Sequence, residues 1–139
     1  MADPVNPTST AQAIAVSALR AQQARMRIIA ENLANANSTS KSPGGDPYQR
    51  QAPVFQATTV AGGKGVKMSR VTPDHTPFNM TYEPGHPSAD AKGYVKTPNV
   101  DPLVEALDMR DAQRAYEANL NVIETARAMD ARTLDLLKR

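Results

Sequence analysis

The sequence predicts a mainly α-helical protein, with long N- and C-terminal helices suited to pairing with each other or with neighbours, and a small irregular β-hairpin and loop segment between them. All seven glycines and all eleven prolines fall at Pro4, at Pro7 or within residues 43–102. Residues 8–42 and 103–139 therefore contain no helix breaker. Since glycine costs about 1 kcal/mol and proline about 3 kcal/mol in a helix interior, this absence favours a helix at each end. Apolar residues that share one helical face in each segment indicate that both helices pack against others.

The N-terminal part is expected to begin with a flexible arm over residues 1–8. A helix is predicted over residues 9–40, with Ser9 or Thr10 as its N-cap. An apolar seam with alternating four- and three-residue spacing follows one face of this helix: Ala15, Leu19, Gln22, Met26, Ile29, Leu33 and Ala36. Such spacing is typical of a coiled-coil interface. Because the seam contains a glutamine and small alanines, the helix is expected to need several neighbours.

Asparagines are frequent near the predicted end of this helix, and two interpretations of them remain open. Asparagine side chains bond readily to nearby backbone groups, so they can simply weaken the last helical turns. Alternatively, Asn32 and Asn35 share a face at three-residue spacing and can donate hydrogen bonds across a packed helix interface.

The middle segment, residues 41–99, is expected to form an irregular β and loop module. A strand is predicted over residues 48–55, where Pro53 indicates an edge or irregular strand. A flexible turn over residues 61–65 precedes a short strand that contains Val66, Met68 and Val71. Strict alternation of Phe78, Met80 and Tyr82 predicts a further strand with one apolar face. A loop over residues 83–87 follows, and residues 89–98 are expected only to lead back to the second helix.

The C-terminal helix is predicted over residues 100–139. Asp101 is a suitable N-cap, Pro102 suits the first helical position, and Glu105 is interpreted as a first-turn acid at the positive end of the helix dipole. One apolar face carries Tyr116, Leu120, Ile123, Leu134 and Leu137. A neighbouring strip of mostly small residues carries Met109, Ala112, Ala115 and Ala126. Two partial stripes indicate contact with more than one neighbour.

Charge and composition limit the possible functions. The net charge of +2 is too balanced to indicate nucleic-acid or anionic-membrane binding, and no apolar run approaches the length of a membrane span. The absence of cysteine excludes disulfides, zinc thiolate sites and cysteine nucleophiles. Residues 8–42 carry four basic residues and one acid, whereas residues 103–139 carry six basic residues and seven acids. The first helix can therefore lie against an acidic part of the second, or both charged faces can simply be solvated.

No arrangement of residues predicts catalysis, a cofactor or a metal. His75 and His86 are the only histidines, and neither lies in a metal-ligand spacing. We expect His86, between Gly85 and Pro87, to form hydrogen bonds within its loop. Residues 62–65 lack the spacing of a phosphate-binding loop and predict a flexible turn.

Several segments resemble bacterial flagellar rod proteins. The string ALRAQQARMRIIAENLANANS, residues 18–38, is similar to the N-terminal helix and asparagine-rich motif of the wider rod and hook group. Residues 44–55, 82–109 and 114–129, which include GYVKTPNVDP and RAYEANL, are similar to the proximal-rod protein C family. The resemblance runs from about residue 9 to residue 138.

This resemblance implies a structural subunit that is not an enzyme, with its N- and C-terminal helices paired as a coiled-coil-like inner domain. It implies export by the flagellar type III apparatus without a cleaved signal, and polymerisation into the hollow, periplasm-spanning rod of the basal body for motility. Implied partners are further copies of the chain, other rod proteins and a ring or export-gate adaptor, without nucleic acid or membrane insertion. The residues expected at the assembly interface are Leu19, Met26, Ile29, Asn32, Leu33, Asn35, Tyr116, Leu120, Ile123, Leu134 and Leu137. A secreted effector, a needle-type subunit or a helical adaptor are the alternatives.

Overall fold

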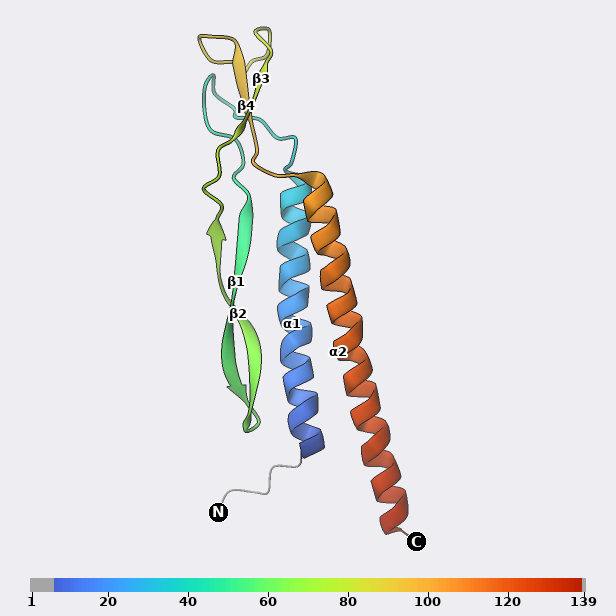
Figure 1. Cartoon of the computed structure of the whole chain (residues 1–139). Helices are drawn as coiled ribbons and strands as arrows, with labels where there is room; N and C mark the ends of the chain where they lie inside the picture. The colour runs from blue at the N-terminus through green and yellow to red at the C-terminus, as the bar shows by residue number, and fades with distance from the viewer. Residues whose placement is uncertain (1–6, 139) are drawn as a thin grey trace. The chain divides into compact units, whose positions relative to one another are not determined.

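The computed structural model describes residues 7–138 and contains two helices and four strands. Figure 1 shows helix α1 (Pro7–Ala34) and helix α2 (Pro102–Leu137) at the two ends of the chain. Between them lie the strands β1 (Gln51–Val60), β2 (Gly63–Pro73), β3 (Asn79–Tyr82) and β4 (Tyr94–Thr97). Two long terminal helices with a small antiparallel β region between them confirm the predicted class.

Helix α1 is shifted from its predicted range of 9–40. It begins at Pro7, because proline fits the first helical turn, where its missing N–H has no partner to lose. It ends at Ala34, where the backbone changes to shorter-range bonds, from Ala36 N to Leu33 O and from Ser38 N to Asn35 O. The first six residues of the predicted N-terminal arm lie outside the described residues.

Strands β1 and β2 pair in a two-stranded sheet that is longer than predicted. The hairpin turn consists of Ala61 and Gly62, whose φ angles of 45° and 77° place both residues in the left-handed region. Two central residues with positive φ are typical of the turn that matches the twist of paired strands, so pairing continues directly on both sides. The glycines at positions 63 and 65 therefore belong to β2 and not to a flexible turn.

Strands β3 and β4 form a second antiparallel pair, in which Asn79 is opposite Thr97 and Tyr82 is opposite Tyr94. The two tyrosine rings meet edge to face, with centroids 5.2 Å apart. Asp90 closes the preceding turn, because its Oδ1 accepts bonds from the amides of Lys92 and Tyr94. Strand β4 was not predicted, since residues 89–98 have no clear alternation and the strand is stabilised by its partner.

Helix α2 begins as predicted. The Asp101 carboxylate accepts bonds from the amides of Leu103 at 2.9 Å and Val104 at 3.4 Å, and Pro102 is the first helical residue. This confirms Asp101 as the N-cap.

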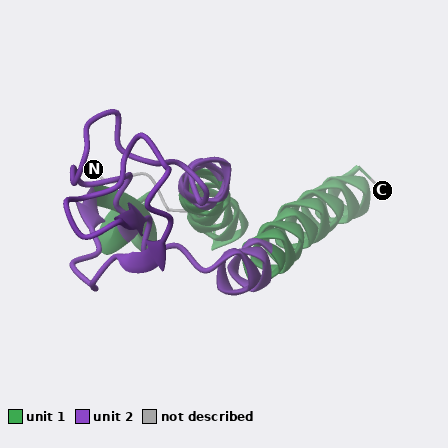
Figure 2. Cartoon of the chain, turned by 90° about the horizontal axis from the view of Figure 1, so that it is seen from above, with its two compact units in different colours: residues 1–26, 54–70, 110–139 green, residues 27–53, 71–109 purple. Residues whose placement is uncertain are grey.

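The described chain forms two compact units, coloured separately in Figure 2. Unit 1 contains residues 7–26, 54–70 and 110–138, and unit 2 contains residues 27–53 and 71–109. The buried side chains of unit 1 are mainly small: Ala15, Ala21, Ala112, Ile123 and Ala126. Those of unit 2 are larger and partly polar: Ile28, Ile29, Asn32, Ala36, Ser88, Val95, Val100 and Glu105.

Candidate functional site

Unit 2 contains a buried polar junction, which we define as Asn32, Tyr48, Arg50, Gln51 and Glu105. Asn32 of α1 is 1% exposed and Glu105 of α2 is 0% exposed. The Asn32 amide nitrogen donates to the Gln51 carbonyl at 2.8 Å and to Glu105 Oε2 at 3.3 Å. Asn32 Oδ1 accepts bonds from the Tyr48 hydroxyl at 2.8 Å and from the Gln51 amide at 2.9 Å. Each polar atom of this buried asparagine is thus satisfied, as burial of a polar group requires.

Arg50 neutralises the buried carboxylate of this junction. Its Nε forms a hydrogen-bonded ion pair with Glu105 Oε1, and its two terminal nitrogens lie 3.4 Å from Asp74 Oδ2 and 3.8 Å from Asp108 Oδ2. Burial alone would lower the pKa of Arg50, but the hydrogen bond and charge of Glu105, together with Asp74, raise it above its ordinary value. The arginine therefore stays charged where the carboxylate needs a partner.

The Tyr48 hydroxyl is kept in its protonated, donating form. Burial, followed by the negative charges of Glu31 and Glu105, raises the pKa of this tyrosine above its ordinary value. Since only the protonated hydroxyl donates to Asn32, this shift preserves the bond between the two residues.

Asn99 extends the junction to the loop after β2. Its Oδ1 accepts a bond from the Arg50 amide at 2.8 Å, and its amide nitrogen donates to the carbonyls of Asp74 at 2.9 Å and Thr76 at 3.1 Å. The Asp74 amide in turn donates to the Arg50 carbonyl at 2.8 Å. These bonds hold the backbone of Arg50, so its guanidinium is positioned toward Glu105.

Unit 1 contains a different kind of contact, in which helix α1 and the β1–β2 hairpin approach closely. Ser17 Oγ accepts a bond from the Val66 amide at 3.1 Å, and Thr10 Oγ1 donates to the Ala61 carbonyl at 3.0 Å. A Cβ added at Gly63 would lie 2.8 Å from Ile14 Cδ1. One added at Gly65 would meet Ser17 Oγ and lie 2.8 Å from Val60 Cγ2. These glycines allow the hairpin backbone to lie against the helix.

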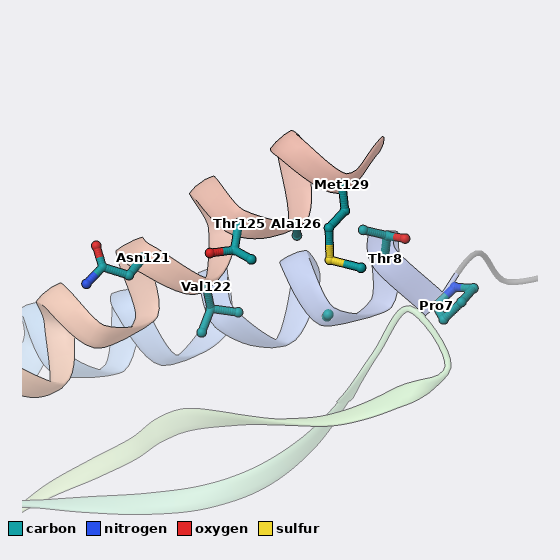
Figure 3. A pocket seen from close by; sticks show the side chains of 8 residues that line it. Pro7, Thr8, Asn121, Val122, Thr125, Ala126 and Met129 are labelled. Carbon is teal, nitrogen blue, oxygen red and sulfur yellow. The ribbon is translucent and has the colours of Figure 1, made fainter. Parts of the chain in front are cut away.

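An apolar groove opens elsewhere in unit 1, between the first turns of α1 and the second half of α2. Its volume is about 470 Å³, and its walls include Pro7, Thr8, Ala11, Val122 and Met129. Figure 3 shows Met129 extending from α2 toward Thr8 at the start of α1. Such a groove between helices is suited to an apolar side chain of another helix.

Within residues 7–138 no three histidine, aspartate or glutamate side chains are grouped to hold a metal ion. Of the two described helices, neither combines the length and the apolarity needed to cross a membrane.

Comparisons with known proteins identify the family. A model described as flagella basal body rod protein matches residues 13–40, and one described as the C-terminal part of flagellar basal body rod FlgEFG proteins matches residues 91–136. Flagellar basal-body rod protein FlgC of Agrobacterium fabrum is 46% identical over 136 residues, which is 96% of this chain and 98% of that protein. Proteins of the same name from Salmonella typhimurium and Bacillus subtilis are 45% and 37% identical, over 88% and 90% of this chain and 92% and 95% of their own lengths.

The chain belongs to the FlgC family of flagellar basal-body rod proteins. It is therefore a structural subunit of the basal-body rod, assembles there with other rod proteins, and is not an enzyme.

The residues expected at the assembly interface of this FlgC-family chain differ in burial. Asn32, Ile29 and Ile123 are buried within the subunit, and Leu19, Met26, Leu33, Asn35 and Tyr116 are half-buried. Leu120, Leu134 and Leu137 are exposed. Whether they meet another subunit remains a prediction.

Asn32 and Asn35 act differently from one another. Asn32 of α1 bonds across to α2, as one of the two interpretations predicted, whereas the side-chain amide of Asn35, one residue past the end of α1, donates to the Glu31 carbonyl of α1 at 2.8 Å. The expected hydrogen bonding of His86 within its loop is confirmed, because its Nδ1 accepts a bond from the Ser88 amide at 3.0 Å.

Glu105 lies in the first turn of α2, as predicted, but sequence reasoning missed its partner. It is fully buried and paired with Arg50. One available signal was its spacing: with Met109, Ala112 and Tyr116 it follows the four- and three-residue pattern of a helix seam.

Proposed function

We propose that this subunit polymerises with further copies and with other rod proteins into the proximal part of the hollow rod. In this proposal α1 and α2 form the axial inner layer, and the β segment forms an outer portion that contacts neighbouring subunits. One observation carries it: Leu134, Leu136 and Leu137 at the end of α2 are 57%, 71% and 79% exposed. Large apolar side chains exposed in a row are suited to burial by neighbouring subunits.

Coiled-coil-like pairing of the two helices is supported by the burial pattern of α2 in unit 1. Ala112, Ile123 and Ala126 are buried, and Tyr116, Asn119 and Asp130 are half-buried. These positions follow one another at alternating four- and three-residue spacing. Gln12 of α1 donates to Asp130 Oδ2 of α2 at 3.1 Å, which joins the two helices within this unit.

Export completes the proposal. The subunit leaves the cytoplasm through the flagellar type III apparatus without a cleaved signal, and a ring or export-gate adaptor receives it at the base of the rod. It binds no nucleic acid and does not insert into the membrane.

The decisive experiment is an in-frame deletion of the gene, complemented with a tagged copy. We expect swimming to be lost on deletion and restored by the tagged copy, and the tag to be found in purified, detergent-resistant basal bodies. Retained swimming, or a tagged protein that stays in the cytoplasm, would contradict the proposal.

A single substitution tests the exposed end of α2. Leu134→Asp should leave the helical content and urea midpoint of the purified chain unchanged, because Leu134 is exposed, yet remove the protein from basal bodies. Arg132→Asp is the control, since Arg132 is also exposed and lies about 200° around the helix. Equal incorporation of both variants would show that Leu134 is not buried on assembly.

A further inference from the structure

A second groove of unit 1 lies between α1 and the β1–β2 hairpin. Its volume is about 350 Å³. The floor is mainly apolar and includes Ala21, Ala24, Val60, Val66 and Met68. Arg20 of α1 and Lys67 of β2 also line it, and both residues are exposed. The groove thus offers an apolar floor with a positive charge on each of the two elements that form it.

The two segments of unit 1 that form this groove carry charges of one sign only. Residues 7–26 of α1 and residues 54–70 of the hairpin contain no acidic residue. They contain five basic residues: Arg20, Arg25, Lys64, Lys67 and Arg70. Such a surface favours a partner that combines an apolar side chain with carboxylates.

The chain itself carries a surface of that kind on α2, also in unit 1. Glu117, Leu120 and Glu124 lie on one helical face, since residues three, four and seven apart are neighbours. All three are exposed, and the exposed fraction of Leu120 is 39%. The two glutamates are two turns apart, about 10 Å along the helix axis. Arg114 and Arg127 lie one turn beyond the glutamates, so the acidic part of the face is limited to these two turns.

We propose that the α1–hairpin groove of one copy binds the Glu117–Leu120–Glu124 face of α2 of a second copy. Leu120 enters the apolar groove, and the flanking glutamates meet Arg20 and Lys67. This inference rests on the proposed polymerisation and names one of its contacts. Because both surfaces are exposed in the same subunit, the contact is made between copies.

The contact joins two different surfaces, so the copy whose groove is filled still presents a free helix face, and the copy whose helix face is bound still presents a free groove. A contact between unlike surfaces that does not close on itself generates a helical assembly. A rod requires this helical symmetry. In such an assembly the opposite charges of the two surfaces help to order the copies.

Disulfide cross-linking between two tagged copies tests the contact directly. The chain contains no cysteine, so each substitution introduces a single thiol. One copy carries Leu120→Cys, and a second copy with a different tag carries Thr58→Cys, at a residue that lines the groove. Both full-length copies are expressed in a strain that lacks the chromosomal gene, and their basal bodies are purified and oxidised. Ala118→Cys replaces Leu120→Cys in the control, since Ala118 is exposed and lies about 200° away around the helix.

We expect a disulfide-linked dimer that contains both tags for the Leu120→Cys pair and none for the Ala118→Cys control. Three results would overturn the inference. The first is that both copies are present in basal bodies but do not cross-link. The second is that the Leu120→Cys copy forms a disulfide only with another protein and not with the Thr58→Cys copy. In the third, both tags are absent from basal bodies, which overturns the proposed function as well and is thereby distinguished from the first two.

Charge reversal provides a second test that does not depend on cysteine geometry. Reversing the groove with Arg20→Glu and Lys67→Glu should abolish swimming, and so should reversing the helix face with Glu117→Lys and Glu124→Lys. All four substitutions in one chain should restore swimming, because each copy then presents both reversed surfaces. If a double variant swims, or if the fourfold variant is exported but does not swim, the two surfaces do not pair.

Discussion

The two units of this subunit are stabilised by different means. Unit 2 buries a network of paired charges and hydrogen bonds around Asn32 and Glu105, whereas unit 1 packs a helix closely against a hairpin through alanines and glycines. The difference shows that one chain can combine a polar junction that has a single arrangement with a core that is filled mainly by small side chains. A buried polar network tolerates only one arrangement of its members, since any other leaves charges unpaired. Small-residue packing instead leaves large apolar side chains such as Leu136 available to neighbours.

Breaking the ion pair of unit 2 should have the largest effect. Glu105→Ala leaves Arg50 without its main partner and should lower the free energy of unfolding by about 3 kcal/mol. This is the low end for a buried pair, because the Arg50 side chain is 22% exposed. Urea denaturation of the purified chain measures it. Glu124→Ala, at an exposed position of the same helix, should change the value by less than about 0.5 kcal/mol. Equal losses for the two variants would mean that the junction does not stabilise unit 2.

Substitutions of Asn32 and Asn35 compare the hydrogen bonds of the buried junction with a local hydrogen bond. Asn32→Ala removes four hydrogen bonds and leaves buried partners unsatisfied, so we expect a loss of about 2 kcal/mol. Asn35→Ala removes one bond to the last turn of α1 and should cost about 0.5 kcal/mol or less. Thermal unfolding followed by circular dichroism is the measurement. A larger shift for Asn35→Ala would reverse the assignment.

Close packing in unit 1 is tested by adding one methyl group. Gly65→Ala should destabilise the fold by about 1–2 kcal/mol, because the new Cβ would collide with Ser17, which accepts the bond from Val66. Gly85→Ala is the matched control, since no atom lies within 4 Å of a Cβ built there. Urea midpoints of the two variants should therefore differ; similar midpoints would show that the hairpin yields easily.

In unit 1, removal of a polar group should raise the free energy of unfolding instead of lowering it. Gln22 Oε1 is buried, and among the described residues it finds no hydrogen-bond partner. Gln22→Met keeps a similar length and should raise the free energy of unfolding by about 1 kcal/mol. Asn32→Met, which removes a satisfied polar group from unit 2, should lower it. A loss of stability in both variants would indicate that Gln22 has a partner after all, such as a water molecule.

The smallest expected effect is a pH dependence. The backbone amide of Thr76, together with Arg50, lowers the pKa of Asp74 below its ordinary value of 3.8. The folded state therefore binds this proton less readily than the unfolded state. Its contribution to stability is complete above pH 3.8 and is lost as the pH falls through the lowered folded pKa. Asp74→Asn should thus be less stable than the parent at neutral pH, and the gap should narrow in acid. A gap in urea midpoint that stays constant down to about pH 2 would contradict this linkage.

Local rules determined much of this protein from sequence alone. Absence of glycine and proline was enough to predict a helix at each end, Asp101 and Pro102 marked the start of α2, and GYVKTPNVDP and RAYEANL indicated the family. These features depend on neighbouring residues, so their signals are present in short segments. The helix boundaries were predicted less accurately. Helix α1 begins two residues earlier than predicted and ends at Ala34, where local turn bonds replace helical ones.

Only the tertiary structure decided which groups meet. Asn32, Arg50 and Glu105 come from three separate segments, the first and the last lie 73 positions apart, and no local pattern assigns their pairing. Strand β4 likewise forms because β3 supplies its hydrogen bonds, and Gly63 and Gly65 acquire their role only because a helix lies against them. The physical reason is the same in each case: burial and pairing energies depend on distance in space, which the order of residues alone does not contain.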